Sequence, residues 1–314
     1  MGGNVFILKA MCRVPGCYFL MNEKYIDNMK LYRISGTVVL GVALLFWSDF
    51  SAKSDTGYSF DGFSYTGKSL DISEHTSNAR ATDWHPDGSE LFVVGRRSVN
   101  VANYSLSEPW DIESAGFSIE LNLSDDLGRL PLRSVAHGLF IREDGEKLWV
   151  FNRTEIYGYK MDEAWDISTA SKSQYKSLSD FVSRGHDFDF HPDGSRLFID
   201  DRNKSAVFQL ELSEPWDVTT AELVYTLDIS DQEEAVRGLE IIDDGRIMLL
   251  MDTDRGEVLK YHLQEPYELQ SAEYGNAFDV SEQTVDPRGL SVSTSMDAFY
   301  VTGRDNEKVY KYRK

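Results

Sequence analysis

The pentapeptide SEPWD occurs twice in this chain, at residues 107–111 and again at residues 213–217. Related segments lie between and after the two copies, DEAWD at 162–166 and QEPYE at 264–268. A segment that returns at a nearly constant spacing is typical of a repeat protein, in which each repeat forms one structural unit. The aromatic residues of the four copies recur every 51 to 55 positions: Trp110, Trp165, Trp216 and Tyr267.

A second shared segment precedes each aromatic copy and predicts a β-hairpin. In the third repeat it reads FDFHPDGSRLFID at residues 188–200, with Pro-Asp-Gly between two apolar runs. Proline presets φ for a turn and glycine accepts a positive φ, so we expect the two runs to pair as antiparallel strands. This segment begins at five places although only four aromatic copies follow: residues 82, 139, 188, 239 and 290.

Each repeat has room for four strands. In the third repeat, alternation of apolar and polar residues predicts strands at 188–190, 196–200, 206–212 and 222–229, with SEPWDVTTA as a loop before the last. Four antiparallel strands in about 50 residues, repeated along the chain, are the sequence signature of β-propeller blades.

The fifth repeat ends at Lys314 after three predicted strands. Its missing strand lies at the other end of the repeat array, because residues 63–73 (FSYTGKSLDIS) resemble residues 223–230 (LVYTLDIS). Closing the ring in this way leaves no open seam between blades. We therefore predict an all-β fold: one five-bladed β-propeller of four-stranded antiparallel blades over residues 56–314, its last blade closed by the N-terminal strand.

The repeated Pro-Asp-Gly turn with its flanking strands resembles the repeats of the YVTN and TolB-like β-propeller group. The resemblance covers nearly all of the chain after residue 68. It implies a propeller scaffold that is usually extracytoplasmic and often binds proteins or polymers. Members of that group usually have more blades, and the PWD loop is not part of their common pattern.

The repeated aromatic residues have a structural and a functional interpretation. They either pack between neighbouring blades or form a ring that stacks on sugar. One such residue per repeat is what blade packing produces, so we expect packing. The histidines of the two HPDG turns, His85 and His191, are likewise expected to be turn residues.

The charge of the chain excludes some classes of partner. It has 52 acidic and 32 basic residues, a net charge of −20. A body this acidic repels the phosphate backbone, so we expect no nucleic-acid partner.

The two cysteines, Cys12 and Cys17, both lie near the N-terminus, so the repeats contain no disulfide and no thiolate metal site.

The N-terminal region resembles an export signal. Residues 34–47 (ISGTVVLGVALLFW) carry no charge, and Lys30 and Arg33 precede them. A basic segment followed by a short apolar run predicts a signal peptide or signal anchor at residues 29–52, with translation starting at Met29 and residues 1–28 as an extension upstream of that start. We expect a secreted or periplasmic protein, attached to a membrane only through this segment if it is retained.

One position of the repeat holds arginine or histidine in all five copies, and it does not lie in a predicted turn. It stands just before each inner strand and is followed mostly by small residues, as expected where strands crowd around the propeller axis. We call the end of the axis at which these residues lie the axial mouth. The ring consists of Arg80, His137, His186, Arg237 and Arg288.

Strand direction places a second arginine of each repeat at the same end: Arg96, Arg153, Arg202, Arg255 and Arg304. Arginine pairs with carboxylate or phosphate through two parallel hydrogen bonds, so the ring predicts an anion-binding site for a protein or carbohydrate ligand. The other interpretation, which the abundance of acids favours, is internal pairing of each arginine with an acid of the next blade, such as Asp83, Asp189 or Glu240.

The same three acids support an enzymatic alternative. Asp83, Asp189 and Glu240 occupy one position in three inner strands, which resembles the site of furanoside- and arabinan-cleaving propeller glycosidases. Asp252 and Asp254 match the first positions of a calcium-binding loop, but the later ligand positions of such a loop do not follow. Apart from this weak match we expect no metal or cofactor. Because most blade positions are alike, we favour a non-catalytic binding or scaffolding propeller over a hydrolase. The sequence leaves the oligomeric state open.

Overall fold

The computed structural model describes five stretches of the chain: residues 6–8, 19–21, 58–124, 136–232 and 235–314. The chain divides into two compact units, Met1–Thr56 and Gly57–Lys314. In the first unit, β1 (Phe6–Leu8) pairs antiparallel with β2 (Phe19–Met21). The predicted upstream extension and export signal otherwise lie outside the described residues. No described helix combines the length and the apolar character needed to cross a membrane.

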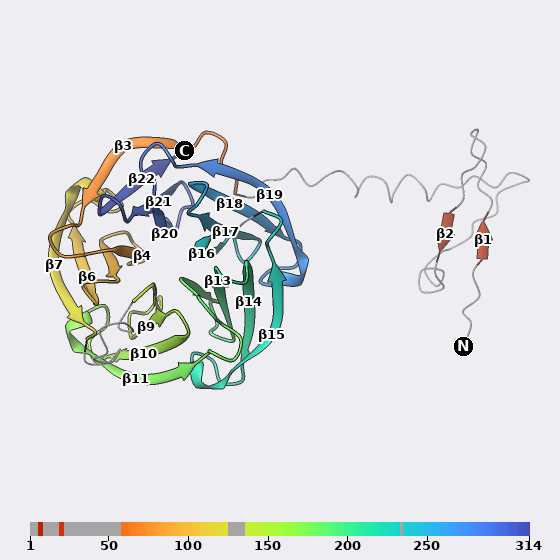
Figure 1. Ribbon diagram of the computed structural model, residues 1–314, viewed down its shortest axis with the longest axis horizontal. Helices are drawn as coiled ribbons and strands as arrows, with labels where there is room; N and C mark the ends of the chain where they lie inside the picture. The colour runs from red at the N-terminus through yellow and green to blue at the C-terminus, as the bar shows by residue number, and fades with distance from the viewer. Residues whose placement is uncertain (1–5, 9–18, 22–57, 125–135, 233–234) are drawn as a thin grey trace, which may run out of the picture. The chain divides into compact units, whose positions relative to one another are not determined.

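The second unit is a propeller of five blades arranged around a central axis (Figure 1), which confirms the predicted all-β fold. Each blade is a sheet of four antiparallel strands. From the inner to the outer strand, the blades are β4 (Ala79–Trp84), β5 (Glu90–Gly95), β6 (Asn100–Leu106) and β7 (Ala115–Asn122); β8 (Gly138–Ile141), β9 (Lys147–Asn152), β10 (Glu155–Met161) and β11 (Ala170–Ser177); β12 (Phe188–Phe190), β13 (Arg196–Asp201), β14 (Ala206–Leu212) and β15 (Ala221–Asp228); β16 (Val236–Ile242), β17 (Ile247–Asp252), β18 (Glu257–Leu263) and β19 (Ala272–Asp279); β20 (Pro287–Val292), β21 (Ala298–Gly303), β22 (Lys308–Arg313) and β3 (Ser64–Asp71).

The fifth blade takes its outer strand from the start of the propeller. Strand β3 pairs antiparallel with β22, with Asp71 opposite Lys308 and Ser64 opposite Arg313. In Figure 1 the orange β3 lies beside the blue strands of the C-terminus. The predicted closure of the ring is therefore confirmed.

The hairpin turns have the backbone that their sequence predicts. In blade three, Gly194 has φ +77°, and its N–H donates to the His191 carbonyl at 2.8 Å. The Nδ1 atom of His191 lies 2.6 Å from Asp193 Oδ1, and His85 makes the same contact with Asp87 at 2.7 Å. Both histidines are thus turn residues, as expected.

The repeated aromatic residues lie at the seams between blades. Each has a φ between +59° and +65°, and its N–H donates to the carbonyl of the turn glycine in its own blade. Each ring also contacts the preceding blade: Trp216 packs on Trp149 and Phe140 of blade two, with ring centroids 5.7 and 6.2 Å away. These contacts support the packing interpretation.

The seam between blades four and five is filled by the residues that lead into β3. Tyr58, Phe60 and Phe63 are buried there together with Phe299, and the half-buried Phe278 packs against them. This segment takes the place of the fifth aromatic loop that the repeats lack. All five seams thus contain a hydrophobic core cluster drawn from two neighbouring blades.

Candidate anion-binding site

Three of the five predicted ring residues lie in β-bulges at the start of inner strands. The pairing register shifts across Arg80 in β4, Arg237 in β16 and Arg288 in β20. A bulge leaves its extra residue unpaired and redirects its side chain. Because blades four, five and one are neighbours, these residues form one continuous series around the axis, which we call the arginine arc.

The small residues that follow the ring allow the inner strands to approach through their backbones. A Cβ atom on Gly289 would come within 2.2 Å of the Arg80 carbonyl oxygen, and one on Gly238 within 2.8 Å of the Arg288 carbonyl oxygen. The expected crowding at the axis is therefore present. It fixes the backbones of the arginine arc next to one another.

Two arginines of the arc, Arg80 and Arg288, are buried and incompletely hydrogen-bonded, and Arg237 is half-buried. Arg80 and Arg288 are 4% and 3% exposed. Arg80 donates from Nη2 to Asn78 Oδ1 at 2.6 Å, and Arg288 forms an ion pair with Asp286. The Nε and Nη1 atoms of both are buried, and within the described parts of the chain they have no hydrogen-bond partner. Buried donors of this kind are costly unless another group supplies acceptors.

Arg237 differs from the other two arginines of the arc in the residue that stands two positions before it. An acceptor stands two residues before each of the other two arginines, but Ala235 holds that position before Arg237. The buried Nε of Arg237 also lacks a partner within the described residues. The sequence analysis did not compare the residues two positions before the ring arginines, although that comparison separates Arg237 from Arg80 and Arg288.

The electrostatic environment is strongly positive. Burial, and then repulsion from Arg96, lower the pKa of Arg80 to about 9. Burial, and then repulsion from Arg202, lower the pKa of Arg237 to about 10. Both guanidinium groups remain charged at neutral pH, so the arc carries concentrated positive charge in an acidic protein.

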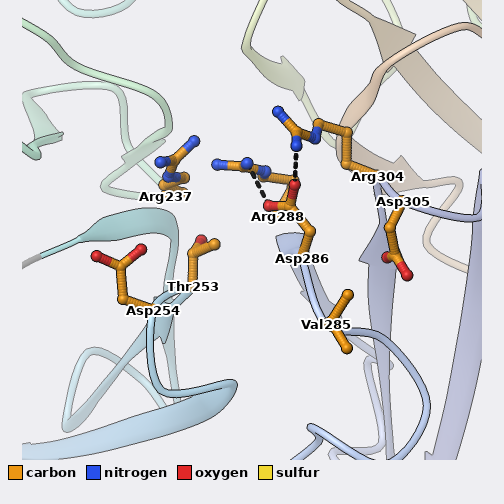
Figure 2. A pocket seen from close by; sticks show the side chains of 8 residues that line it. All are labelled: Arg237, Thr253, Asp254, Val285, Asp286, Arg288, Arg304 and Asp305. Atoms are coloured by element: carbon orange, nitrogen blue, oxygen red, sulfur yellow. Dashed lines mark ion pairs between the residues drawn. The ribbon is translucent and has the colours of Figure 1, made fainter.

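A pocket of about 450 Å³ opens beside the arc, between blades four and five. Figure 2 shows Arg288 and Arg304 both paired with Asp286, and Arg237 at the same side of the pocket. The position of Arg304 confirms that the second arginine of this repeat lies at the axial mouth. The pocket is lined by Arg237, Thr253, Asp254, Val285, Asp286, Arg288, Arg304 and Asp305.

Other members of the second arginine set make contacts at the same end. Arg202 Nη2 lies 3.5 Å from Asp254 Oδ2, and Arg255 donates to the Gln232 carbonyl. Arg184, which sequence analysis did not single out, adds positive charge: burial and then repulsion from Arg202 lower its pKa. It stands two residues before His186, the same offset that places Asp286 before Arg288.

Two of the acids proposed as arginine partners instead connect neighbouring blades. Asp83 Oδ2 accepts from the Ile141 N–H of blade two at 2.5 Å, and Asp189 Oδ2 accepts from the Ile241 N–H of blade four at 2.7 Å. The other oxygen of each accepts from the next N–H in its own strand. Within the described residues no ion pair joins either acid to the arginine arc, so the expected internal pairing is wrong for them.

The three predicted carboxylates are nevertheless close enough to influence one another. Burial raises the pKa of Asp83 and of Asp189 to about 7, although main-chain N–H groups oppose the shift. Burial, followed by repulsion from Asp189 and Asp83, raises the pKa of Glu240 well above its ordinary value. Each of these acids stands three residues after the ring position of its own repeat, farther along the inner strand.

The remaining ring positions hold two neutral histidines. The rings of His137 and His186 meet edge to face with 4.8 Å between centroids. Burial lowers the pKa of both well below the ordinary value, followed by repulsion from His186 for His137 and from Arg237 for His186. The ring therefore consists of a charged arc and an uncharged imidazole pair.

The partial calcium loop has a local structural role. Asp252 Oδ1 accepts from the main-chain N–H groups of Asp254 and Arg255 at 2.9 and 3.0 Å. Across residues 58–124, 136–232 and 235–314, no group of three or more His, Cys, Asp or Glu side chains is arranged to hold a metal ion.

A second pocket of about 360 Å³ lies where β3 meets the SEPWD loop of blade one. Its charges are paired within the protein. Lys68 contacts Asp111 at 2.6 Å, and Lys311 donates to the Trp110 carbonyl at 2.7 Å. In contrast to the axial mouth, the lysines of this pocket have partners within the protein, and their contacts stabilise the seam between blades five and one.

Comparisons with known proteins give similar solved structures but no matching family model or curated sequence. The chain is similar in structure to the periplasmic gluconolactonase PpgL of Pseudomonas aeruginosa, with 14% identity, a TM-score of 0.46, and 74% of this chain and 65% of that chain covered.

It is similar to the same degree to a putative 6-phosphogluconolactonase from Bacteroides uniformis, with 11% identity, a TM-score of 0.45 and coverage of 73% and 64%. A third similar structure is the β-propeller domain of Cps50 (Swd1) from Myceliophteria thermophila, with 6% identity, a TM-score of 0.46 and coverage of 80% and 99%. The chain spans less than two thirds of the length of the two lactonase structures. Membership of the YVTN or TolB-like group, expected from the repeats, stays a prediction.

Proposed function

We propose that this chain is a non-catalytic binding propeller whose axial mouth binds an anionic ligand through a carboxylate or phosphate group. The observation that carries the proposal is the arginine arc, in which Arg80, Arg237 and Arg288 keep buried N–H groups without a partner among the described residues. An anion of the ligand supplies the missing acceptors and neutralises the arc. Arginine suits this role because its planar fork binds both groups in a bidentate manner.

The arc is unlike the paired charges elsewhere in the protein. Of its neighbours, Asp286 is shared between Arg288 and Arg304, so one carboxylate serves two guanidinium groups. Arg237 has no acceptor two residues before it. A protein with a net charge of −20 has many acids, and leaving buried guanidinium N–H groups without acceptors among the described residues is costly unless a ligand supplies them.

The hydrolase alternative receives less support. A glycoside hydrolase needs one carboxylic acid and one ionised carboxylate that reach the substrate. Both oxygens of Asp83 and both oxygens of Asp189 accept main-chain N–H groups, which holds neighbouring blades together. Polysaccharide cleavage that is lost in Glu240→Gln would overturn the non-catalytic reading.

Calorimetric titration of the full chain with acetate and with inorganic phosphate tests the proposal. We expect one site, and a loss of affinity of about tenfold or more in Arg237→Gln and in Arg80→Gln, because each charge-assisted contact contributes at least about 1.4 kcal/mol. Arg313→Gln is the matched control, since Arg313 is exposed and pairs with Asp297 at the hairpin end of blade five.

Equal losses in all three variants would point to overall charge and contradict a specific site. Absence of binding of both anions to the unmodified chain at constant ionic strength would overturn the proposal. The ionic strength is fixed because screening weakens every charge interaction.

Export of the protein is part of the same proposal. It rests on the basic residues Lys30 and Arg33 before an uncharged apolar run. N-terminal sequencing of the protein recovered outside the cytoplasm tests it: a mature chain that begins before residue 29 would contradict the assignment of the start at Met29.

A further inference from the structure

His137 and His186 occupy the blade-two and blade-three positions of the ring, next to the arginine arc. They are 2% and 3% exposed. Both ring nitrogens of His137 and the Nδ1 atom of His186 are buried, and they have no hydrogen-bond partner in the described parts of the chain. The imidazole pair thus presents unused polar atoms at the same end of the axis as the arc.

An imidazole always has hydrogen-bonding groups to satisfy. In its neutral form one nitrogen donates and the other accepts, and in its protonated form both donate. Burial of an unsatisfied polar side chain is costly, and such groups in proteins normally have a partner. The pair therefore indicates a ligand group rather than simple packing.

The charged groups around the pair are almost all positive. Among the described residues, the acids close to His186 engage main-chain groups: Asp200 accepts from the His186 N–H at 2.5 Å, Asp187 from the Leu239 N–H at 3.2 Å, and Asp201 from the Arg184 N–H at 3.2 Å. Burial raises the pKa of Asp200 to about 8, so it carries little negative charge near neutral pH. The groups that act on the two rings are each other, Arg80, Arg96, Arg153, Arg184, Arg202 and Arg237.

We propose that His137 and His186 form a second anion position beside the arginine arc, and that an acid group of the ligand fills it with uptake of protons from solvent. The ligand class is then an anion with two acid groups, such as a dicarboxylate, one on the arc and one on the imidazole pair. This inference rests on the proposed function of the arc as an anion-binding site.

Ligand binding is coupled to protonation of the two histidines because of the charges that surround them. Without ligand, the surrounding arginines and burial keep both rings neutral. A negative group placed against the pair reverses the local charge and makes the imidazolium form a charge-assisted donor. Binding then tightens as the pH falls, by up to about tenfold per pH unit for each proton taken up.

The experiment titrates the full chain calorimetrically with acetate, succinate and ethane-1,2-disulfonate between pH 6 and pH 8. The disulfonate stays fully ionised in this range, so its pH dependence reports on the protein alone. Repeating the titration in buffers with different ionisation enthalpies measures the number of protons taken up. We expect the two dianions to bind about tenfold or more tightly at pH 6 than at pH 8, and acetate to change far less.

His137→Gln and His186→Gln remove the titrating group and keep a neutral hydrogen-bonding side chain. We expect each single variant to lose part of the pH dependence, and the double variant to bind the dianions with nearly the same affinity at both pH values. His85→Gln, in a hairpin turn at the other end of the blades, is the control and should keep the pH dependence.

Three results would overturn the inference: dianions that bind no more tightly than acetate at pH 6, no net proton uptake, or a pH dependence that persists undiminished in the double histidine variant. The proton count is obtained on the unmodified chain, so the test does not depend on how the variants fold. If acetate binds and Arg237→Gln abolishes it while the dianions show no pH effect, only this inference fails. If no anion binds, the proposed function fails with it.

Discussion

The indole ring of Trp216 lies directly on Gly194, the glycine of the hairpin turn in the same blade. A Cβ atom at position 194 would come within 2.4 Å of the ring, and the Trp216 N–H donates to the Gly194 carbonyl at 3.0 Å. Both residues have positive φ, +65° and +77°. The turn and the aromatic loop are therefore one structural unit, which explains why the two sequence motifs repeat together.

Replacement of Trp216 by alanine is expected to lower the free energy of unfolding by about 3 kcal/mol, because it empties part of the seam between blades two and three. Urea denaturation at pH 7 measures the change. Tyr225→Ala, at an exposed position of the outer strand in the same blade, is the control and should change stability far less. Similar losses in both variants would contradict the seam role.

Replacement of Gly289 by alanine is expected to destabilise the protein and weaken anion binding together. Its Cβ would collide with the Arg80 carbonyl oxygen at 2.2 Å, so the inner strands of blades five and one must separate. Gly116→Ala is the matched control, since a Cβ there meets nothing within 4 Å. Urea denaturation and acetate titration of both variants check this. Unchanged stability and unchanged acetate affinity in Gly289→Ala would show that the arc does not depend on this contact.

Ring closure can be tested by truncation. Removal of residues 1–57 is expected to leave a cooperative unfolding transition, because Tyr58 and the residues after it fill the last seam. Removal of residues 1–72 also deletes β3 and is expected to abolish that transition, since β22 then has an unpaired edge. Circular dichroism with thermal denaturation distinguishes the two. Equal stability of both truncations would show that the closing strand is dispensable.

Asp83→Asn is expected to gain stability relative to the unmodified protein as the pH rises from about 4 to about 7. The folded-state pKa of Asp83 is raised to about 7 by burial, so its contribution to stability is full at low pH and is lost as the pH rises through this window. Asparagine does not titrate and keeps an acceptor for the Ile141 N–H. Urea denaturation at several pH values measures the difference, and a difference that does not change with pH would contradict the raised pKa.

The blade pattern was predictable because each strand and turn carries its own local signal. Pro-Asp-Gly turns and period-two alternation depend on neighbouring residues only, so the strands of blade three, predicted at 206–212 and 188–190, are found where expected. Closure was predictable for the same reason, since residues 63–73 resemble the outer strand of another blade.

The contacts of the axial mouth were only partly predictable, because they depend on bulges and on distances between blades. Alignment of the repeats indicated the five ring residues, but it favoured Asp83 and Asp189 as arginine partners. The bulges turn Arg80 and Arg288 toward residues two positions upstream, Asn78 and Asp286, while the acids reach the next blade. A one-residue register shift of this kind leaves no trace in an apolar pattern.

The order of the strands also affects how the protein is made. During translation β3 leaves the ribosome before every other strand of the propeller, and its partner β22 is the last to emerge. The nascent chain must therefore keep β3 from pairing with other edges until β22 has emerged. A chain released early, without β22, has no partner for β3 and is expected to be removed by quality-control proteases.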